Sequence, residues 1–215
     1  MTHPVWPLFD LRITTPTVEL RYIDDQLACE LAVLAAKGVH DPSFMPFTLP
    51  WTDVAPPEQE RRTMQWFWRC RAETEPGRFH LGLAVLVDGE AVGTTSIGVA
   101  DFDVLGEFET GSWLGVAHQG RGLGTALRLA TLHLGFAGMG ARTARTAAFA
   151  DNAPSLGVTR RLGYTQVGTE QMVRRGETAT QLRFHMSRAH WETNLRTDDI
   201  VIEGLDPCRE LLGLG

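Results

Sequence analysis

The chain has 215 residues, of which 43% are hydrophobic, and its formal net charge is -6 at pH 7. This length and hydrophobic content predict one globular domain with its own core, and the acidic balance argues against a general nucleic-acid-binding protein. No apolar run approaches the roughly 18 residues of a membrane span, and the three cysteines have neither an even count nor metal-ligand spacing. We therefore expect a cytoplasmic protein with no membrane segment, no metal site and no disulfide framework.

Proline, glycine and hydrophobic periodicity divide the chain into helices and strands. In chain order we expect a strand broken at Pro16, a helix capped by Asp24 or Asp25, an irregular segment His40–Pro57, a second helix and a hairpin. A strand, a helix, a strand, a short helix and two final strands follow. The expected ranges are 8–14 and 18–22, 25–37, 58–72, 79–87 and 91–99, 107–116, 122–138, 142–148, 151–163, 164–173 and 178–187. This order predicts an α/β (α+β) fold.

A glycine-rich turn joins the strand that ends near Val116 to the helix that follows. Its sequence is Gln119-Gly120-Arg121-Gly122-Leu123-Gly124. Backbone N–H groups of such a turn can surround an anion at the positive end of a helix, so we expect a pyrophosphate to bind here. Two other phosphate loops are excluded. Arg121 and Gly122 replace the Lys and Ser/Thr of a P-loop, and Thr125 replaces the third small residue of a dinucleotide fingerprint.

A second motif lies downstream, and the two together resemble the GNAT superfamily of acyl-CoA-dependent N-acyltransferases. Gln119 to Gly124 is similar to the family's pyrophosphate loop, while Asp151-Asn152-Ala153-Pro154-Ser155 and Leu162-Gly163-Tyr164 are similar to the helix that contacts the pantetheine arm. The resemblance implies one GNAT-type domain over residues 1–190. Its central sheet would be mixed, mostly antiparallel and about seven-stranded, with two strands splayed to admit the donor.

The beginning and the end of the chain add three expectations. Asp10 to Pro16 with Leu20-Arg21 resembles the ribosomal-protein N-terminal (alanine) acetyltransferase branch. Pro7 to Arg12, with the segment from Gly38 to Phe47, resembles an actinobacterial subgroup that includes N-succinyltransferases. Residues 191–215 exceed the usual domain and are expected to form an edge strand or an oligomer contact, so we expect a homo-oligomer.

The resemblance implies transfer of an acetyl or succinyl group from acetyl-CoA or succinyl-CoA to a primary amine by direct attack in a ternary complex. The acceptor would be a protein N-terminus, a lysine or a small amine, and neither nucleic acid nor a membrane is an expected partner. Thr159 stands where many members carry a tyrosine acid. The alternative is therefore a non-catalytic acyl-CoA-binding sensor.

Particular residues are expected to carry this chemistry. Glu109 is the candidate general base, with Glu107, Asp101 and Asp103 as competitors, and Ser155 is expected beside the CoA sulfur. The competing interpretation of Glu109 is a surface residue paired with an arginine. The expected CoA contacts are Leu114, Gly115, Val116, Gln119, Gly120, Arg121, Gly122, Leu123, Gly124, Thr125, Asn152 and Ser155. The expected acceptor-side residues are His40, Phe47, Trp51 and Trp66.

Overall fold

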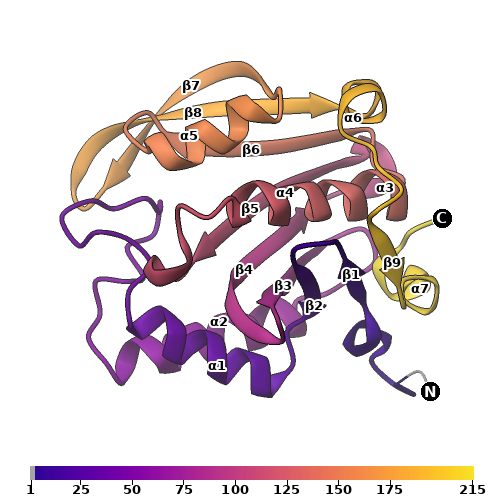
Figure 1. Ribbon diagram of the computed structural model, residues 1–215, viewed down its shortest axis with the longest axis horizontal. Coiled ribbons are helices and arrows are strands. Elements are labelled where there is room, and N and C mark those ends of the chain that lie inside the picture. The colour runs from indigo at the N-terminus through magenta and orange to yellow at the C-terminus, as the bar shows by residue number, and fades with distance from the viewer. Residues whose placement is uncertain (1–2) are drawn as a thin grey trace.

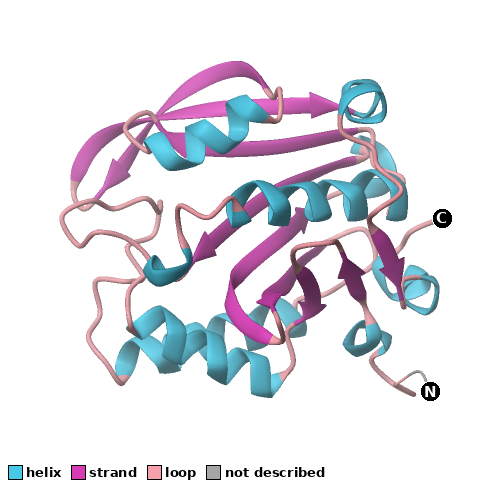
Figure 2. Ribbon diagram, in the orientation of Figure 1, coloured by secondary structure: helices cyan, strands magenta, loops and turns pink. Residues whose placement is uncertain are grey.

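One mixed sheet runs through the molecule, with helices on both of its faces (Figures 1 and 2). The structure is a computed structural model and describes residues 3–215. The strand order is β7-β8-β6-β5-β4-β3-β2-β1-β9. The strands are β1 Arg12–Thr14, β2 Glu19–Tyr22, β3 Phe79–Val87, β4 Glu90–Val99, β5 Glu107–Leu114, β6 Thr143–Phe149, β7 Thr165–Arg174, β8 Glu177–Ser187 and β9 Val201–Glu203.

The helices divide between the two faces of the sheet. Alternate residues of β3 contact different helices, since Leu83 and Val85 join the core under α4 whereas Ala84 and Leu86 pack with α1. Core residues of α5 belong to the same cluster as those of α4. The helices are α1 Asp25–Ala36, α2 Glu58–Ala72, α3 Phe102–Leu105, α4 Leu123–His133, α5 Ala153–Arg161, α6 Arg188–Asn194 and α7 Arg209–Leu212, and a π-helical turn at Leu134–Gly138 continues α4.

Strands β5 and β6 separate after a short parallel pairing. Their register runs from Glu107↔Thr143 to Glu109↔Arg145, whereas β5 stays paired with β4 as far as Leu114. A wedge therefore opens between β5 and β6, and its narrow end lies beside Glu109. The predicted α/β fold, with a mixed sheet and a splayed strand pair, is confirmed.

The sheet has nine strands rather than about seven. The predicted broken first strand is wrong in detail, because its first residues form a 3-10 helix, Pro7–Asp10, and the rest fold into the antiparallel pair β1–β2. The reversal is local, since the Thr15 hydroxyl accepts from the N–H of Val18 and donates to the Val18 carbonyl. Strand β9 adds the ninth strand by pairing with β1.

The chain after residue 190 is part of the same core. Trp191 is 1% exposed and stacks on Phe136 at 5.3 Å between ring centroids. Leu205 and Leu212 are buried in the cluster that also contains the α4 residues. Residues 191–215 therefore complete the domain at the β1 edge of the sheet rather than forming a separate unit.

Gly204 provides a test of that packing. Its φ is +74°, and a Cβ there would lie 2.2 Å from the carbonyl oxygen of Asp10. We expect Gly204→Ala to lower the free energy of unfolding by about 1–3 kcal/mol, because the strand β9 must move to relieve the overlap. Urea unfolding measures this loss. Gly89→Ala is the control, since Gly89 has φ +83° and open space around it. Equal losses in the two variants would contradict the expectation.

Candidate active site

The glycine-rich turn leaves a run of backbone N–H groups without acceptors. Gly120 and Gly122 have φ of +74° and +81°, and a Cβ at either would meet nothing within 4 Å. Helix α4 begins after Gly122 with no side-chain cap. Within residues 3–215, the N–H groups from Gly120 to Gly124 donate no hydrogen bond, whereas that of Thr125 donates to the Gly122 carbonyl at 3.0 Å. Five unpaired amides at a helix N-terminus form a suitable anion site.

The side chain of Gln119 holds this turn in place. Its Nε2 donates to the carbonyl of Leu114, at the end of β5, and to the carbonyl of Val39, both at 2.8 Å. Gln119 thus joins the turn, the donor strand and the beginning of the irregular segment. Its amide nitrogen is used within the protein, so we propose that Gln119 positions the loop rather than contacting CoA through its side chain.

Replacing Gln119 by methionine tests this role. The variant loses both hydrogen bonds at similar side-chain size, and we expect its affinity for CoA to fall roughly tenfold, since each such bond contributes about 0.5–1.5 kcal/mol. Calorimetric titration with CoA measures the change. The control is Gln26→Met, because Gln26 is exposed on α1 and bonds to Glu30 of the same helix. Unchanged affinity in Gln119→Met would rule out the positioning role.

Three residues are expected to bind the acyl-CoA donor through their backbone N–H groups, but two of these groups already donate hydrogen bonds within the protein. The N–H of Gly115 donates to the Val92 carbonyl and that of Val116 donates to the Gly38 carbonyl, each at 3.0 Å. Successive N–H groups of a strand point to opposite sides, so the N–H of Leu114 points away from β4, toward the wedge. Of the three residues, we therefore propose that only Leu114 binds the donor through its backbone N–H group.

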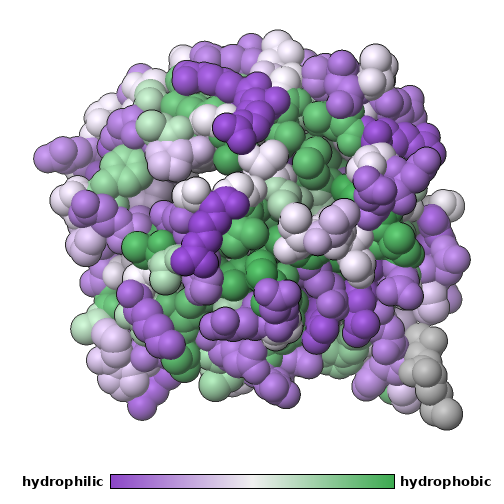
Figure 3. Space-filling view, in the orientation of Figure 1, coloured by the Kyte–Doolittle hydropathy of each residue, from purple (hydrophilic) through white to green (hydrophobic). Residues whose placement is uncertain are grey.

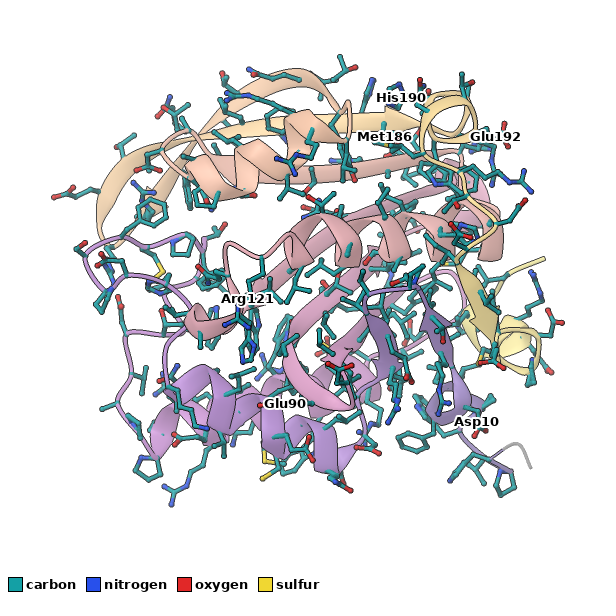
Figure 4. The ribbon with its side chains drawn as sticks, viewed as in Figure 1. Asp10, Glu90, Arg121, Met186, His190 and Glu192 are labelled. Atoms are coloured by element: carbon teal, nitrogen blue, oxygen red, sulfur yellow. The ribbon has the colours of Figure 1, made fainter. Side chains whose placement is uncertain are left out.

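The other residues that are expected to contact CoA belong to the loop before α4, to α4 itself and to the start of α5. In the space-filling view the surface is hollowed between α5 and the loop that leads into α4 (Figure 3). Arg121 is exposed on the front of that loop (Figure 4). The Asn152 side chain caps α5 by accepting from the N–H of the half-buried Ser155 at 3.2 Å. Gly124 of α4 faces α5, since a Cβ there would contact the Val158 side chain at 3.4 Å.

Glu109 lies on the face of β5 opposite α4, where two depressions of about 430 and 470 Å³ meet. Glu107 and Arg145 line the same two depressions and form an ion pair with each other at 3.1 Å. Among residues 3–215, the Glu109 carboxylate has no such partner. Of its competitors, Glu107 and Asp101 are paired with arginines. Asp103 is also without an ion pair among residues 3–215, but it lines neither depression. Of the four candidate carboxylates, Glu109 is therefore the one that lines the depressions and is not paired with an arginine.

His80 lies in the same row of the sheet as Glu109, although no sequence motif indicated it. It pairs with Gly98 of β4, which in turn pairs with Glu109, so the two side chains lie on one row across three strands. Burial lowers the pKa of His80, so its imidazole is neutral at neutral pH. Trp66 contacts it edge-on at 5.4 Å. The alternation of Phe79–Val87 placed His80 on a strand, but no local motif indicated its partners.

The other acceptor-side candidates form one aromatic row. His40 contacts Phe47, Phe47 contacts Trp51, and Trp51 contacts Trp113 of β5, with ring centroids 5.2–5.9 Å apart. This aromatic row connects the irregular segment to β5. Trp113 was not among the residues predicted for the acceptor side. Trp66 lies apart from this row, beside His80.

The turn between β7 and β8 holds the irregular segment against the start of α5 (Figure 1). Arg174 pairs with Asp151 at 2.7 Å and donates to the Met45 carbonyl at 3.3 Å. Arg175 forms an ion pair with Asp53 and donates to the Pro42 carbonyl. These arginines lower the pKa of Asp151 and of Asp53. These contacts hold the irregular segment at Pro42 and Met45, near its start, and at Asp53, near its end.

Residues 3–215 contain no group of three or more His, Cys, Asp or Glu side chains placed to hold a metal ion. None of the helices described is both long and apolar enough to cross a membrane.

Comparisons with known proteins give a family and a fold. The family described as acetyltransferase (GNAT) domain matches residues 18–165. The solved structure of RimJ from Mycobacterium smegmatis in complex with CoA-disulfide is similar at a TM-score of 0.68 and 22% identity, covering 89% of this chain and 97% of that one. RimL, a ribosomal L7/L12 alpha-N-protein acetyltransferase in complex with coenzyme A, is similar at a TM-score of 0.69 and 18% identity, covering 80% and 95%. A GCN5-related N-acetyltransferase from Brucella melitensis is similar at 0.66 and 21%, covering 84% and 80%.

Proposed function

Because the chain belongs to the acetyltransferase (GNAT) family, we propose that it transfers an acyl group from a CoA thioester to a primary amine. The observation that carries the proposal is the run of five unpaired amides from Gly120 to Gly124 at the start of α4, beside the wedge between β5 and β6. A pyrophosphate bound there would direct the thioester toward the wedge. Acetyl and succinyl groups are both compatible with this arrangement.

The proposed reaction is a direct attack in a ternary complex. The amine nitrogen forms a bond to the thioester carbonyl carbon. Glu109 lies five residues back along β5 from Leu114, so it takes the proton that the amine loses through a chain of water molecules. The Leu114 N–H stabilises the negative charge that develops on the carbonyl oxygen. The carbon–sulfur bond then breaks, and the sulfur leaves as a thiolate near Ser155, which offers a hydroxyl hydrogen bond.

The acceptor is proposed from the comparisons rather than from the site. RimL is described as a ribosomal L7/L12 alpha-N-protein acetyltransferase, and this chain shares its fold. We propose a protein N-terminus as the first acceptor class, with lysine side chains and small amines as further candidates. The row from His40 to Trp113 and the pair formed by Trp66 and His80 would contact it. A homo-oligomeric state and a cytoplasmic location remain predictions.

The decisive experiment incubates the purified protein with acetyl-CoA or succinyl-CoA and a panel of amines. The panel contains peptides with free N-termini, the same peptides with a blocked N-terminus and an internal lysine, and small polyamines. Released CoA thiol and the mass of the product report turnover. Turnover with any amine supports the transferase. Binding of CoA without turnover across the panel, unchanged in Glu109→Gln, would instead support an acyl-CoA sensor.

A further inference from the structure

A buried arginine lies in the wedge between β5 and β6, on the face of the sheet covered by α4. Arg128 projects from α4 and is 5% exposed. Its Nη1 donates to the hydroxyl of Thr110 at 2.9 Å and to that of Thr146 at 3.1 Å, and its Nη2 donates to the hydroxyl of Ser112 at 3.4 Å. These three residues belong to the two strands that separate here.

The positive charge of Arg128 has no counter-ion. Of the ion pairs in residues 3–215, none includes Arg128. Its Nε is buried and has no hydrogen-bond partner. A guanidinium stays charged in proteins, and burying a charge without an anion costs several kcal/mol. A buried cation with only hydroxyl partners is therefore suited to an anion that comes with a ligand.

The free donors of Arg128 have the geometry that a carboxylate requires. Nη1 uses both of its hydrogens, whereas Nε uses none and Nη2 makes one long bond. The edge formed by Nε and Nη2 presents two parallel N–H groups, which match the two oxygens of a carboxylate. Nη2 also lies nearest to Ser112, which is exposed and lies toward the open end of the wedge.

A purely structural role for the charge is not needed at this position. The hydroxyl of Thr146 donates to the Thr110 carbonyl at 3.2 Å, and that of Thr110 donates to the Arg145 carbonyl at 3.3 Å. These two bonds already bridge the strands where they separate. An apolar side chain of the same length on α4 would fill the space without the cost of a buried charge.

We propose that Arg128 receives the terminal carboxylate of a short dicarboxylic acyl-CoA, of which succinyl-CoA is the type, and so selects the acyl group. The inference rests on the proposed function, because it places the thioester at Leu114. Ser112 is two residues back along the strand, about 7 Å away. The three carbon–carbon bonds of a succinyl group, each about 1.5 Å, followed by a charge-assisted hydrogen bond of about 2.8 Å, cover a similar length. An acetyl group is too short to reach the guanidinium.

The test compares acetyl-CoA, succinyl-CoA and CoA by calorimetric titration against the wild-type protein, Arg128→Met and Arg128→Lys. The wild type should bind succinyl-CoA at least tenfold more tightly than acetyl-CoA. Arg128→Met should lose roughly 10- to 100-fold in affinity for succinyl-CoA, since it removes the charge-assisted hydrogen bonds to the carboxylate. Its affinity for acetyl-CoA and CoA should change less than threefold. Arg128→Lys, which keeps the charge but not the paired donors, should fall between.

Arg145→Met is the matched control, because Arg145 is a cation on the opposite face of the neighbouring strand. Loss of the succinyl preference in Arg145→Met but not in Arg128→Met would overturn the proposal. Equal losses of affinity for succinyl-CoA and acetyl-CoA in Arg128→Met would also overturn it, because they would show that Arg128 has a structural role. If Arg128→Met does not fold, the wild-type titration still decides, since equal affinity for the two donors sinks the proposal. Failure of all three ligands to bind would instead refute the acyl-CoA site itself.

Discussion

Gly122→Asp is expected to lower the affinity for acyl-CoA at least about 100-fold, which corresponds to about 2.7 kcal/mol. The substitution puts a carboxylate at the start of α4, where five backbone N–H groups have no acceptor and where we place the pyrophosphate. Repulsion between the carboxylate and the phosphates should dominate, because the space around Gly122 is open and aspartate tolerates a left-handed backbone better than most residues. Calorimetric titration with CoA and acetyl-CoA measures the loss.

Gly140→Asp is the matched control for this experiment. Gly140 also has φ +81° and open space around it, but it lies beyond the far end of the helix that starts at Leu123. Both variants therefore carry the same backbone strain and the same added charge. If Gly140→Asp binds CoA as the wild type does and Gly122→Asp does not, the loop is the phosphate site. Similar affinities in the two variants would contradict that assignment.

Glu109→Gln is expected to reduce kcat/KM about 10²- to 10⁴-fold at neutral pH, the range for loss of a general base. Glutamine keeps the size of the side chain but accepts a proton far less readily. Affinity for CoA should stay the same, because Glu109 lies on the face of β5 opposite α4. Steady-state kinetics with the best amine of the panel, together with CoA titration, separates the two effects.

The pH dependence of Glu109→Gln gives an independent check. An N-terminal amine has a pKa near 8 and a lysine amine near 10.4, so a neutral nucleophile becomes abundant only as the pH rises toward these values. The deficit of the variant should shrink in that range, because a base is no longer required. Glu107→Gln is the control, since Glu107 lines the same depressions but is paired with Arg145. A loss of kcat/KM that stays constant with pH, or an equal loss in Glu107→Gln, would rule out Glu109 as the general base.

Features that depend on neighbouring residues were predictable. The helix that Asp24 caps begins at Asp25, and the glycine-rich turn has the left-handed backbone at Gly120 and Gly122 that glycine allows. The same holds for Asn152, whose side chain caps α5. The prediction that failed locally was the first strand, where Thr15 reverses the chain and turns one expected strand into the pair β1–β2.

The sequence by itself determined the family, the order of elements and the phosphate loop, because each is encoded in short motifs and in the periodicity of nearby residues. Only the tertiary structure decided which carboxylate is unpaired, since Arg145 reaches Glu107 across 38 residues of chain and leaves Glu109 free. It also placed His80 in the same row and buried Arg128 where β5 and β6 part. These facts depend on strand register and on helix packing over the sheet, and no local pattern of residues specifies either of them.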